Sequence, residues 1–255
     1  MILTLDVGNT SITAGIYDSD ELVKKFRIPS DRTLTIEEYE AMLASNIEQL
    51  SISGVIIGSV VEELNDRLSY AVSNLYNIKP IILSDKSNMT IKIALKNNSE
   101  IGADRIANGF RAYELYKKAV IVVDFGTATT FDIVNSNGEF IGGIIAPGLQ
   151  TQLSVLSKAT SKLPQLDVEH IEKAIGNCTA DAILSGVVRG SACMIDGMLT
   201  QCETEMNEKP IIIATGGFCN IISKYMTRKF DYISPNLTIE GLRDLYKLNS
   251  RTIIK

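Results

Sequence analysis

The chain has 255 residues, of which 45% are hydrophobic and 22% charged, so it is long and apolar enough to bury a sizeable core. Its formal net charge of −5 disfavours nonspecific binding to nucleic acid or to an anionic membrane surface. No run reaches the roughly 18 unbroken apolar residues of a membrane-spanning helix. The N-terminal residues lack the basic segment of a secretory signal, and we therefore expect a cytoplasmic globular protein.

The cysteines and the single histidine predict neither a zinc site nor a disulfide framework. The histidine is His170, and no two cysteines form a C-x-x-C pair. We expect reduced thiols at all four cysteine positions: Cys178, Cys193, Cys202 and Cys219.

The first half of the chain opens on three predicted strands. Ile2–Asp6 is a short apolar run, and Ser11–Tyr17 and Glu21–Ile28 follow it after polar turns. The spacing of apolar residues then predicts helices and further strands. The helices are Thr35–Leu50, Glu62–Tyr76 and Ile101–Tyr116, and the strands are Val55–Val60 and Pro80–Leu83.

The second half repeats this opening. The apolar run Ala119–Asp124 precedes a Gly-Thr turn and the predicted strands Thr129–Val134 and Glu139–Ile145. The later predicted elements are the helices Thr179–Glu205, Phe218–Thr227 and Thr238–Tyr246 and the strand Pro210–Thr215. The repeated order indicates an internal duplication of architecture. With a boundary near Lys117 and Lys118, it predicts two halves, residues 1–117 and 118–255.

Each half has an aspartate and a glycine-threonine turn directly after its first strand. Asp6 precedes Gly8-Asn9-Thr10, and Asp124 precedes Gly126-Thr127. Glycine lets backbone N–H groups approach an anion closely, and an adjacent carboxylate can hold Mg²⁺ directly or through water. One such turn is also an ordinary hairpin connection. Two of them predict a grip on a polyphosphate and favour phosphoryl transfer.

A third glycine-rich turn follows the predicted strand near residue 211. Paired glycines at Gly216-Gly217 would let a base or ribose lie against the backbone. Taken alone, this turn is equally consistent with a simple strand-to-helix connection.

Together these motifs resemble type III pantothenate kinase. Their order is DVGNT (6–10), GADR (102–105), DFGTATT (124–130), GGIIAPG (142–148), ATGG (214–217) and PNLTIEGL (235–242), so the resemblance extends from Ile2 to about Leu248. It implies an α/β fold with two ribonuclease-H-like halves of the actin/hexokinase/hsp70 type, each a mixed five-stranded sheet flanked by helices. The reaction it implies is ATP-dependent phosphorylation of pantothenate to 4′-phosphopantothenate, the first step of coenzyme A biosynthesis. The enzyme implied is a homodimer whose active site is shared across the interface.

The resemblance also implies the residues of the ATP site. Asp6 corresponds to the position beside Mg²⁺ and ATP, and Asp124 to a ligand of a monovalent cation, K⁺ or NH₄⁺. A carboxylate at the end of a buried strand is partly desolvated, which suits a cation partner. The ATP-binding residues implied are Asp6, Val7, Gly8, Asn9, Thr10, Ser11, Ile12, Thr13, Gly126, Thr127, Thr129, Gly216 and Gly217.

GADR corresponds to the family's catalytic and substrate-binding segment. Asp104 matches the residue that receives the proton of the substrate hydroxyl, and the planar fork of Arg105 suits the carboxylate of pantothenate. Gly102 and Ala103 complete the segment, and Thr179 matches a threonine that contacts pantothenate from the neighbouring subunit. Without the family, the same residues are consistent with a charged helix start and with a helix N-cap at Thr179.

The chain departs from the family pattern near the substrate pocket. Leu95 stands in place of a tyrosine and Asn98 in place of a proline, while Cys178 and Arg189 also replace the usual residues. These changes lie outside the phosphate motifs.

Two alternatives remain open. One is a kinase or phosphatase of the same superfamily acting on another small acid or sugar, which the position of GADR before DFGTATT disfavours. The other is a non-catalytic regulator that senses nucleotide or pantothenate. The presence of Asp6, Asp104 and Asp124 together disfavours a regulator, because a binding module has less need of all three.

Overall fold

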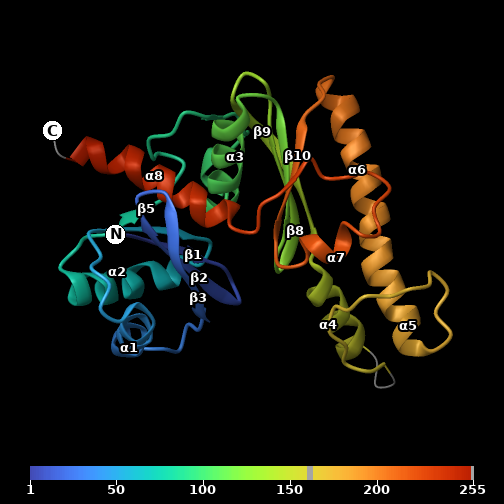
Figure 1. Cartoon of the computed structure of the whole chain (residues 1–255), viewed down its shortest axis with the longest axis horizontal. Helices are drawn as coiled ribbons and strands as arrows, with labels where there is room; N and C mark the ends of the chain where they lie inside the picture. The colour runs from blue at the N-terminus through green and yellow to red at the C-terminus, as the bar shows by residue number, and fades with distance from the viewer. Residues whose placement is uncertain (160–162, 254–255) are drawn as a thin grey trace. The chain divides into compact units, whose positions relative to one another are not determined.

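The computed structural model of the chain describes residues 1–159 and 163–253 (Figure 1). It divides into two compact units. The first unit comprises Met1–Glu114 and the C-terminal segment from Leu237, and the second comprises Leu115–Asn236. This division differs from the expected halves, because the last helix packs with the N-terminal residues instead of with the second half.

The first unit is built on a mixed five-stranded sheet in the order β3-β2-β1-β4-β5. The hairpins β1–β2 and β2–β3 are antiparallel, whereas β4 lies parallel to β1 and β5 parallel to β4. The strands are β1 (Ile2–Val7), β2 (Ser11–Asp18), β3 (Glu21–Pro29), β4 (Gly54–Ser59) and β5 (Ile81–Ile82). The other elements are α1 (Ile36–Ile47), α2 (Glu62–Tyr76), the short strand β6 (Lys92–Ile93), a 3₁₀ turn (Asn98–Glu100), α3 (Ala103–Tyr116) and α8 (Leu237–Ile253).

The two faces of this sheet have different side chains. Because successive residues of a strand point to opposite faces, Leu3 and Leu5 of β1 pack with α1 and α2 in one apolar core. The opposite face of the sheet carries small residues, which allow α8 to pack closely against it. A Cβ added at Gly54 would lie 1.9 Å from Oη of Tyr246, and one at Gly58 would lie 2.7 Å from Cδ2 of Leu242. The glycines therefore leave room for the Tyr246 and Leu242 side chains of α8.

The second unit repeats this strand order as β9-β8-β7-β10-β11, with antiparallel hairpins and then parallel pairs. Its strands are β7 (Val120–Phe125), β8 (Ala128–Val134), β9 (Glu139–Pro147), β10 (Ile211–Gly216) and β11 (Tyr232–Ile233). Its helices are α4 (Leu149–Ala159), α5 (Thr179–Leu184), a π-helical turn η2 (Ser185–Arg189), α6 (Gly190–Met206) and α7 (Cys219–Ile222). Helices and sheet share one core. The predicted α/β fold class and the duplicated strand order are confirmed, but these five strands belong to a six-stranded sheet where five strands were expected.

One continuous helix, Thr179–Met206, is long and apolar enough to cross a membrane by length and composition alone. Its inner face belongs to the core of the second unit, where Val188, Ile195 and Leu199 are fully buried. A core helix passes the same test, and we interpret it as one.

Several predicted elements differ from the observed ones. Helix α4 was not predicted, and the helix expected at Phe218–Thr227 is a single turn, Cys219–Ile222. Helix α8 continues through Asn249 to Ile253, beyond the predicted helix Thr238–Tyr246. Asn249 accepts a hydrogen bond from the backbone N–H of Asn88 (2.8 Å). Residues 254 and 255 lie outside the described part of the chain.

Candidate active site

The first predicted phosphate motif forms the turn between β1 and β2. The N–H of Gly8 donates to the carbonyl of Ser11 (3.1 Å), and the N–H of Val60 donates to the carbonyl of Val7 (3.0 Å). Arg32 donates to the side chain of Asn9 (3.4 Å). The turn is thus held by the end of β4 on one side and by a basic side chain on the other.

The catalytic segment predicted from GADR begins at this same edge of the sheet. Asp6 pairs with Gly58 in the parallel strand β4, and a Cβ at Gly58 would lie 3.6 Å from Cβ of Ala103. The carboxyl ends of parallel strands are where α/β proteins place their ligands. The structure therefore brings Asp6 and the start of α3 to one edge.

Asp104 lies in the first turn of α3, folded back on its own backbone. Its Oδ1 accepts a hydrogen bond from the N–H of Arg105 (2.8 Å). A Cβ at Gly102 would lie 2.4 Å from the same oxygen, so the carboxylate of Asp104 occupies space that a larger residue at position 102 would need. Burial raises the pKa of Asp104, and the nearby N–H and charge of Arg105 oppose that rise. A carboxylate with a raised pKa is a stronger base than an exposed aspartate.

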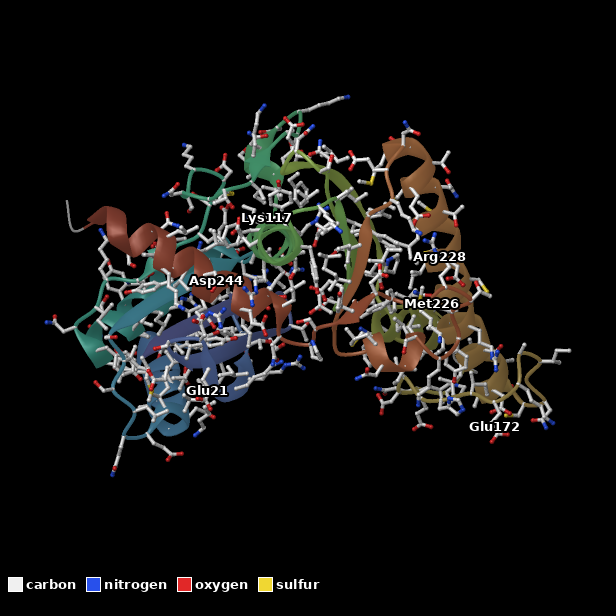
Figure 2. All side chains as sticks on the ribbon, turned by 45° about the horizontal axis from the view of Figure 1, so that its top comes forward. Glu21, Lys117, Glu172, Met226, Arg228 and Asp244 are labelled. Carbon is white, nitrogen blue, oxygen red and sulfur yellow. The ribbon has the colours of Figure 1, made fainter. Side chains whose placement is uncertain are left out.

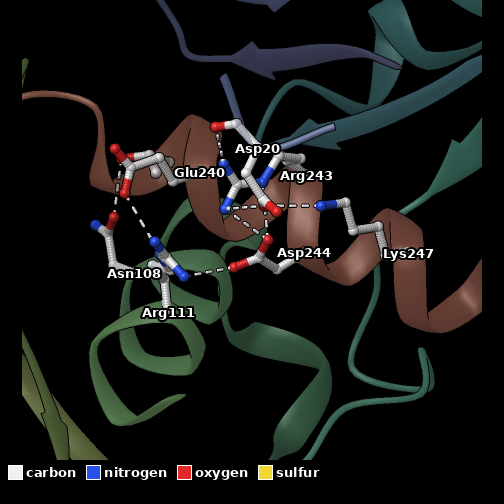
Figure 3. A network of polar contacts seen from close by, with 8 residues as sticks. Asp20, Asn108, Arg111, Glu240, Arg243, Asp244 and Lys247 are labelled. Carbon is white, nitrogen blue, oxygen red and sulfur yellow. Dashed lines mark hydrogen bonds and ion pairs between the residues drawn. The ribbon is translucent and has the colours of Figure 1, made fainter. Parts of the chain in front are cut away.

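Helix α3 is fixed to α8 by a polar network (Figure 3). Thr238 donates to the side chain of Asn108 (2.8 Å), one turn beyond Asp104. Arg111 bridges Glu240 (3.3 Å) and Asp244 (2.7 Å), and all three side chains are at most one-quarter exposed. These contacts hold the helix that presents the candidate base.

The same network extends from α8 to the β2–β3 hairpin. Arg243, only 5% exposed, donates to the carbonyl of Asp20 (2.8 Å) and lies over the ring of Tyr17 (5.0 Å to its centroid). Lys247 donates to the carboxylate of Asp20 (2.8 Å), which lowers the pKa of that group. The hairpin, α8 and α3 therefore form one connected support.

The second phosphate motif, in the second unit, is held in place by hydrogen bonds from the segment that leads into α4. The N–H of Gly148 and the hydroxyl of Thr151 both donate to the carbonyl of Thr127 (3.1 and 2.7 Å). A Cβ at Gly148 would lie 2.4 Å from the carbonyl oxygen of Gly126. The start of α4, reached through the GGIIAPG segment, thus packs directly on the DFGT turn.

The third glycine turn lies against the same motif. The N–H of Gly217 donates to the carbonyl of Phe125 (3.1 Å). Gly216 has φ +87°, and a Cβ there would lie 2.6 Å from Oδ1 of Asp124. A residue with a side chain is disfavoured at Gly216 for two reasons: the positive φ is strained for L-residues, and the added Cβ would clash with its neighbours. The DFGT, GGIIAPG and ATGG motifs are therefore contiguous in the second unit.

Thr179 is the first residue of α5 and is exposed. The N-cap is Cys178, whose Sγ accepts from the N–H of Asp181 (3.5 Å). The interpretation of Thr179 as the cap is therefore wrong by one residue. Its hydroxyl does not perform the capping role.

The sequence did not reveal what holds the loop before Thr179. Arg189, at the end of the π-helical turn, donates to the carbonyl of Ile171 (3.2 Å) and lies over the ring of Tyr225 (4.8 Å). Ser185, at the start of that turn, donates to the carbonyl of Ala174. Figure 2 labels Glu172 on this loop, whose carbonyl is a further acceptor for Arg189. The departure at Arg189 is thus an anchor for the loop.

Comparison with known proteins gives consistent matches over the whole chain. The family model described as type III pantothenate kinase matches residues 2–201. A type III pantothenate kinase of Geotalea daltonii is 37% identical over 254 residues, which cover 98% of this chain and 99% of the relative. One of an Anaeromyxobacter species is 35% identical over 254 residues, covering 98% and 100%.

Solved structures share the fold at low sequence identity. A protein of Campylobacter jejuni described as a Baf family transcriptional activator has a TM-score of 0.63 at 19% identity, covering 98% of this chain and 99% of that one. A ROK family glucokinase of Streptomyces griseus has a TM-score of 0.52 at 13% identity, covering 96% and 99%.

Proposed function

The chain belongs to the type III pantothenate kinase family, and we propose that it transfers the γ-phosphoryl group of ATP to pantothenate, forming 4′-phosphopantothenate for coenzyme A biosynthesis. The observation that supports this most directly is the position of Asp104. It stands at the start of α3, at the sheet edge that also carries the DVGNT turn, and its pKa is raised by burial.

In this proposal Asp104 accepts the proton of the primary hydroxyl of pantothenate as that oxygen attacks the γ-phosphorus. Phosphoryl transfer passes through a loose transition state in most analyses, so orienting the hydroxyl matters as much as removing its proton. The backbone N–H of Arg105 orients the carboxylate, and the absence of a side chain at Gly102 leaves room for it. A fixed carboxylate loses little freedom when the substrate binds.

Arg105 and Thr179 are proposed to bind pantothenate. The planar guanidinium of Arg105 can donate two parallel hydrogen bonds to the substrate carboxylate. The exposed hydroxyl of Thr179 can donate or accept one more, and Gly102 and Ala103 bring the backbone close to the substrate.

The nucleotide is proposed to bind through the glycine turns with a divalent cation. Among the described residues no three His, Cys, Asp or Glu side chains cluster as a metal site. This fits Mg²⁺ that arrives on ATP and takes Asp6 as one ligand, since Mg²⁺ keeps several waters and phosphate oxygens. Bound there, it would neutralise phosphate charge. Asp124, with the carbonyls of its turn, offers oxygen ligands to K⁺ or NH₄⁺.

We propose that the active form is a cytoplasmic homodimer. The surface around α4 and α5 is apolar and open: Val155 is 58% exposed and Leu156 37% exposed, and they line a groove with Ile183 and Gly186. A second copy covering this surface would bury it, as oligomer interfaces do. Thr179 lies at the start of the same helix, α5, so the dimer would carry it into a partner's site.

The test is product identification by mass spectrometry. Purified protein, Mg-ATP and K⁺ are incubated with pantothenate, and separately with a panel of small hydroxy acids and sugars. We expect 4′-phosphopantothenate and loss of turnover when Na⁺ replaces K⁺. Phosphorylation of a panel compound in preference to pantothenate would contradict the proposal, and so would ATP binding without any product.

A further inference from the structure

The DVGNT turn contains the carboxylate of Asp6 and backbone N–H groups, and its basic neighbour Arg32 donates to the side chain of Asn9. Phosphoryl transfer depends on neutralising the charge of the transferred group, and Arg or Lys side chains usually share this work with Mg²⁺. A basic side chain on the sheet face that carries Asp6 would lie beside the phosphates in the first unit.

The strand register places Arg27 in one row with Asp6. Asp6 of β1 pairs with Thr13 of β2, and Thr13 pairs with Arg27 of β3. Directly paired residues in neighbouring strands point to the same face. With strands about 4.8 Å apart, a long arginine side chain on the third strand can reach toward the first. The row lies near the DVGNT end of the β1–β2 hairpin.

This row is on the face of the sheet where the candidate base lies. Gly58, the partner of Asp6 in β4, is the residue whose added Cβ would meet Ala103 of α3. The next row, which includes Thr4 and Gly15, is covered: Thr4 is fully buried and Gly15 lies under Ile239 of α8. Asp6 and Thr13 are only half-buried and Arg27 is exposed. The row of Arg27 is thus accessible to a ligand.

The charges on this face leave Arg27 available. Lys25, two residues earlier, has its pKa lowered by burial and then by Arg27, while Asp6 and Glu240 oppose that change. Arg27 and Lys25 are therefore close enough to repel each other. Within residues 1–159 and 163–253 no carboxylate lies within ion-pair distance of the Arg27 guanidinium. Two neighbouring cations of which one lacks a carboxylate partner suit an anionic ligand.

The ordinary alternative is a solvated surface arginine. Lys24, on the same strand but the opposite face, shows what such a residue does here: it pairs with Glu48 at 3.0 Å, and that carboxylate is 68% exposed. Arg27 differs because its face carries Asp6 and Thr13, both implied in ATP binding.

We propose that Arg27 contacts the phosphate groups of bound ATP and stabilises the charge of the transferred phosphoryl group. This inference rests on the proposed function for its catalytic part. Its binding part requires only that ATP binds at the DVGNT turn, beside the row of Asp6, Thr13 and Arg27 that the strand register defines. Lys25 adds positive charge to the same place, although Asp6 and Glu240 already interact with it.

The test compares Arg27→Gln, Arg27→Lys and the matched control Lys24→Gln. Because hydrogen bonds to charged groups are strong, we expect Arg27→Gln to lower kcat/KM for ATP about 10- to 100-fold. Arg27→Lys should recover part of the loss, while the KM for pantothenate and the Lys24→Gln variant stay close to wild type. Unchanged kcat/KM for ATP, or a rise confined to the KM for pantothenate, would overturn the proposal.

A binding measurement separates this inference from the proposed function. Calorimetric titration with Mg-ATP and with adenosine requires no turnover and no second substrate. Arg27→Gln should weaken ATP binding and leave adenosine binding unchanged, even if pantothenate proves not to be the substrate. Equal losses for ATP and adenosine would show that Arg27 supports the fold of the site without contacting phosphate, and would refute the proposal. Circular dichroism confirms that each variant is folded.

Discussion

At the scale of single residues, the proposed chemistry depends on a carboxylate, Asp104, that is kept partly away from water. Burial raises the pKa of Asp104 above that of an ordinary aspartate. Between the two pKa values the folded protein binds more protons than the unfolded chain. The free energy of unfolding therefore falls as pH rises through that window and stays lower above it. The burial of the Asp104 carboxylate thus lowers the stability of the folded protein above its pKa.

This sign predicts that Asp104→Asn stabilises the protein at neutral pH. The amide keeps the acceptor for the N–H of Arg105 and removes the buried charge. We expect a gain of about 0.5–2 kcal/mol at pH 7 that disappears at pH values well below the usual aspartate pKa. Urea unfolding at several pH values measures it. The control Asp66→Asn changes an exposed carboxylate on α2 and should have little effect. Destabilisation of Asp104→Asn at pH 7 would contradict this sign.

A functional residue could be predicted from the sequence when it belongs to a short sequence motif. Asp6, Asp104 and Asp124 each belong to a short motif, so the sequence identified them as candidates. Arg27 has no such motif around it: its relation to Asp6 exists only through the register of three strands. Cys178 was missed as the cap of α5 because a thiol is a poor acceptor compared with the neighbouring Thr179.

At the scale of elements, α8 is the main support of the candidate base. It is the last helix of the chain, yet it packs on β1 and β4 and is bonded to α3. Gly241 allows this approach, because a Cβ there would lie 2.3 Å from the carbonyl oxygen of Ala107. Periodicity predicted that α8 is a helix but not where it packs, since its position depends on glycines in other strands and helices.

The network between α3 and α8 predicts a linked loss of stability and turnover. Arg111→Met removes the partner of Glu240 and one of the two partners of Asp244, which keeps its ion pair with Arg243 (2.7 Å). We expect the free energy of unfolding to fall by about 1–3 kcal/mol. We also expect kcat to fall, because α3 presents Asp104. Denaturant unfolding and steady-state kinetics measure both effects.

The matched control is Lys24→Met, which breaks the exposed pair with Glu48. That change should cost about 0.2–1 kcal/mol and leave kcat unchanged. Equal effects of the two variants would mean that the α3–α8 network does not position the base.

At the scale of the whole molecule, the strand order of the first unit recurs in the second. The sequence predicted this duplication from two short strand-and-turn patterns. It placed the last helix in the wrong half, because the chain returns to the first unit after Asn236. Helix α4 escaped prediction because only Leu149 and Leu153 of its residues are buried, which is too few for a clear apolar stripe.

A shared active site predicts complementation between two inactive variants. Asp104→Asn and Thr179→Ala each disable every site of their own homodimer at low pantothenate concentration. In a mixed dimer, one site receives intact Asp104 from one chain and intact Thr179 from the other. Refolding the two together should restore up to about a quarter of wild-type turnover, since half the dimers are mixed and each has one intact site. Activity equal to the sum of the separate variants would contradict a site shared in this way.

The most direct test of the central claim is the rate of pantothenate-dependent ADP release by wild type, Asp104→Asn and Asp66→Asn, with Mg-ATP and K⁺ saturating. The account predicts that Asp104→Asn loses about 100- to 10,000-fold in kcat while its affinity for Mg-ATP is retained. Asp66→Asn should match wild type. If Asp104→Asn keeps kcat within about threefold of wild type, Asp104 is not the proton acceptor, since general-base catalysis contributes far more than that.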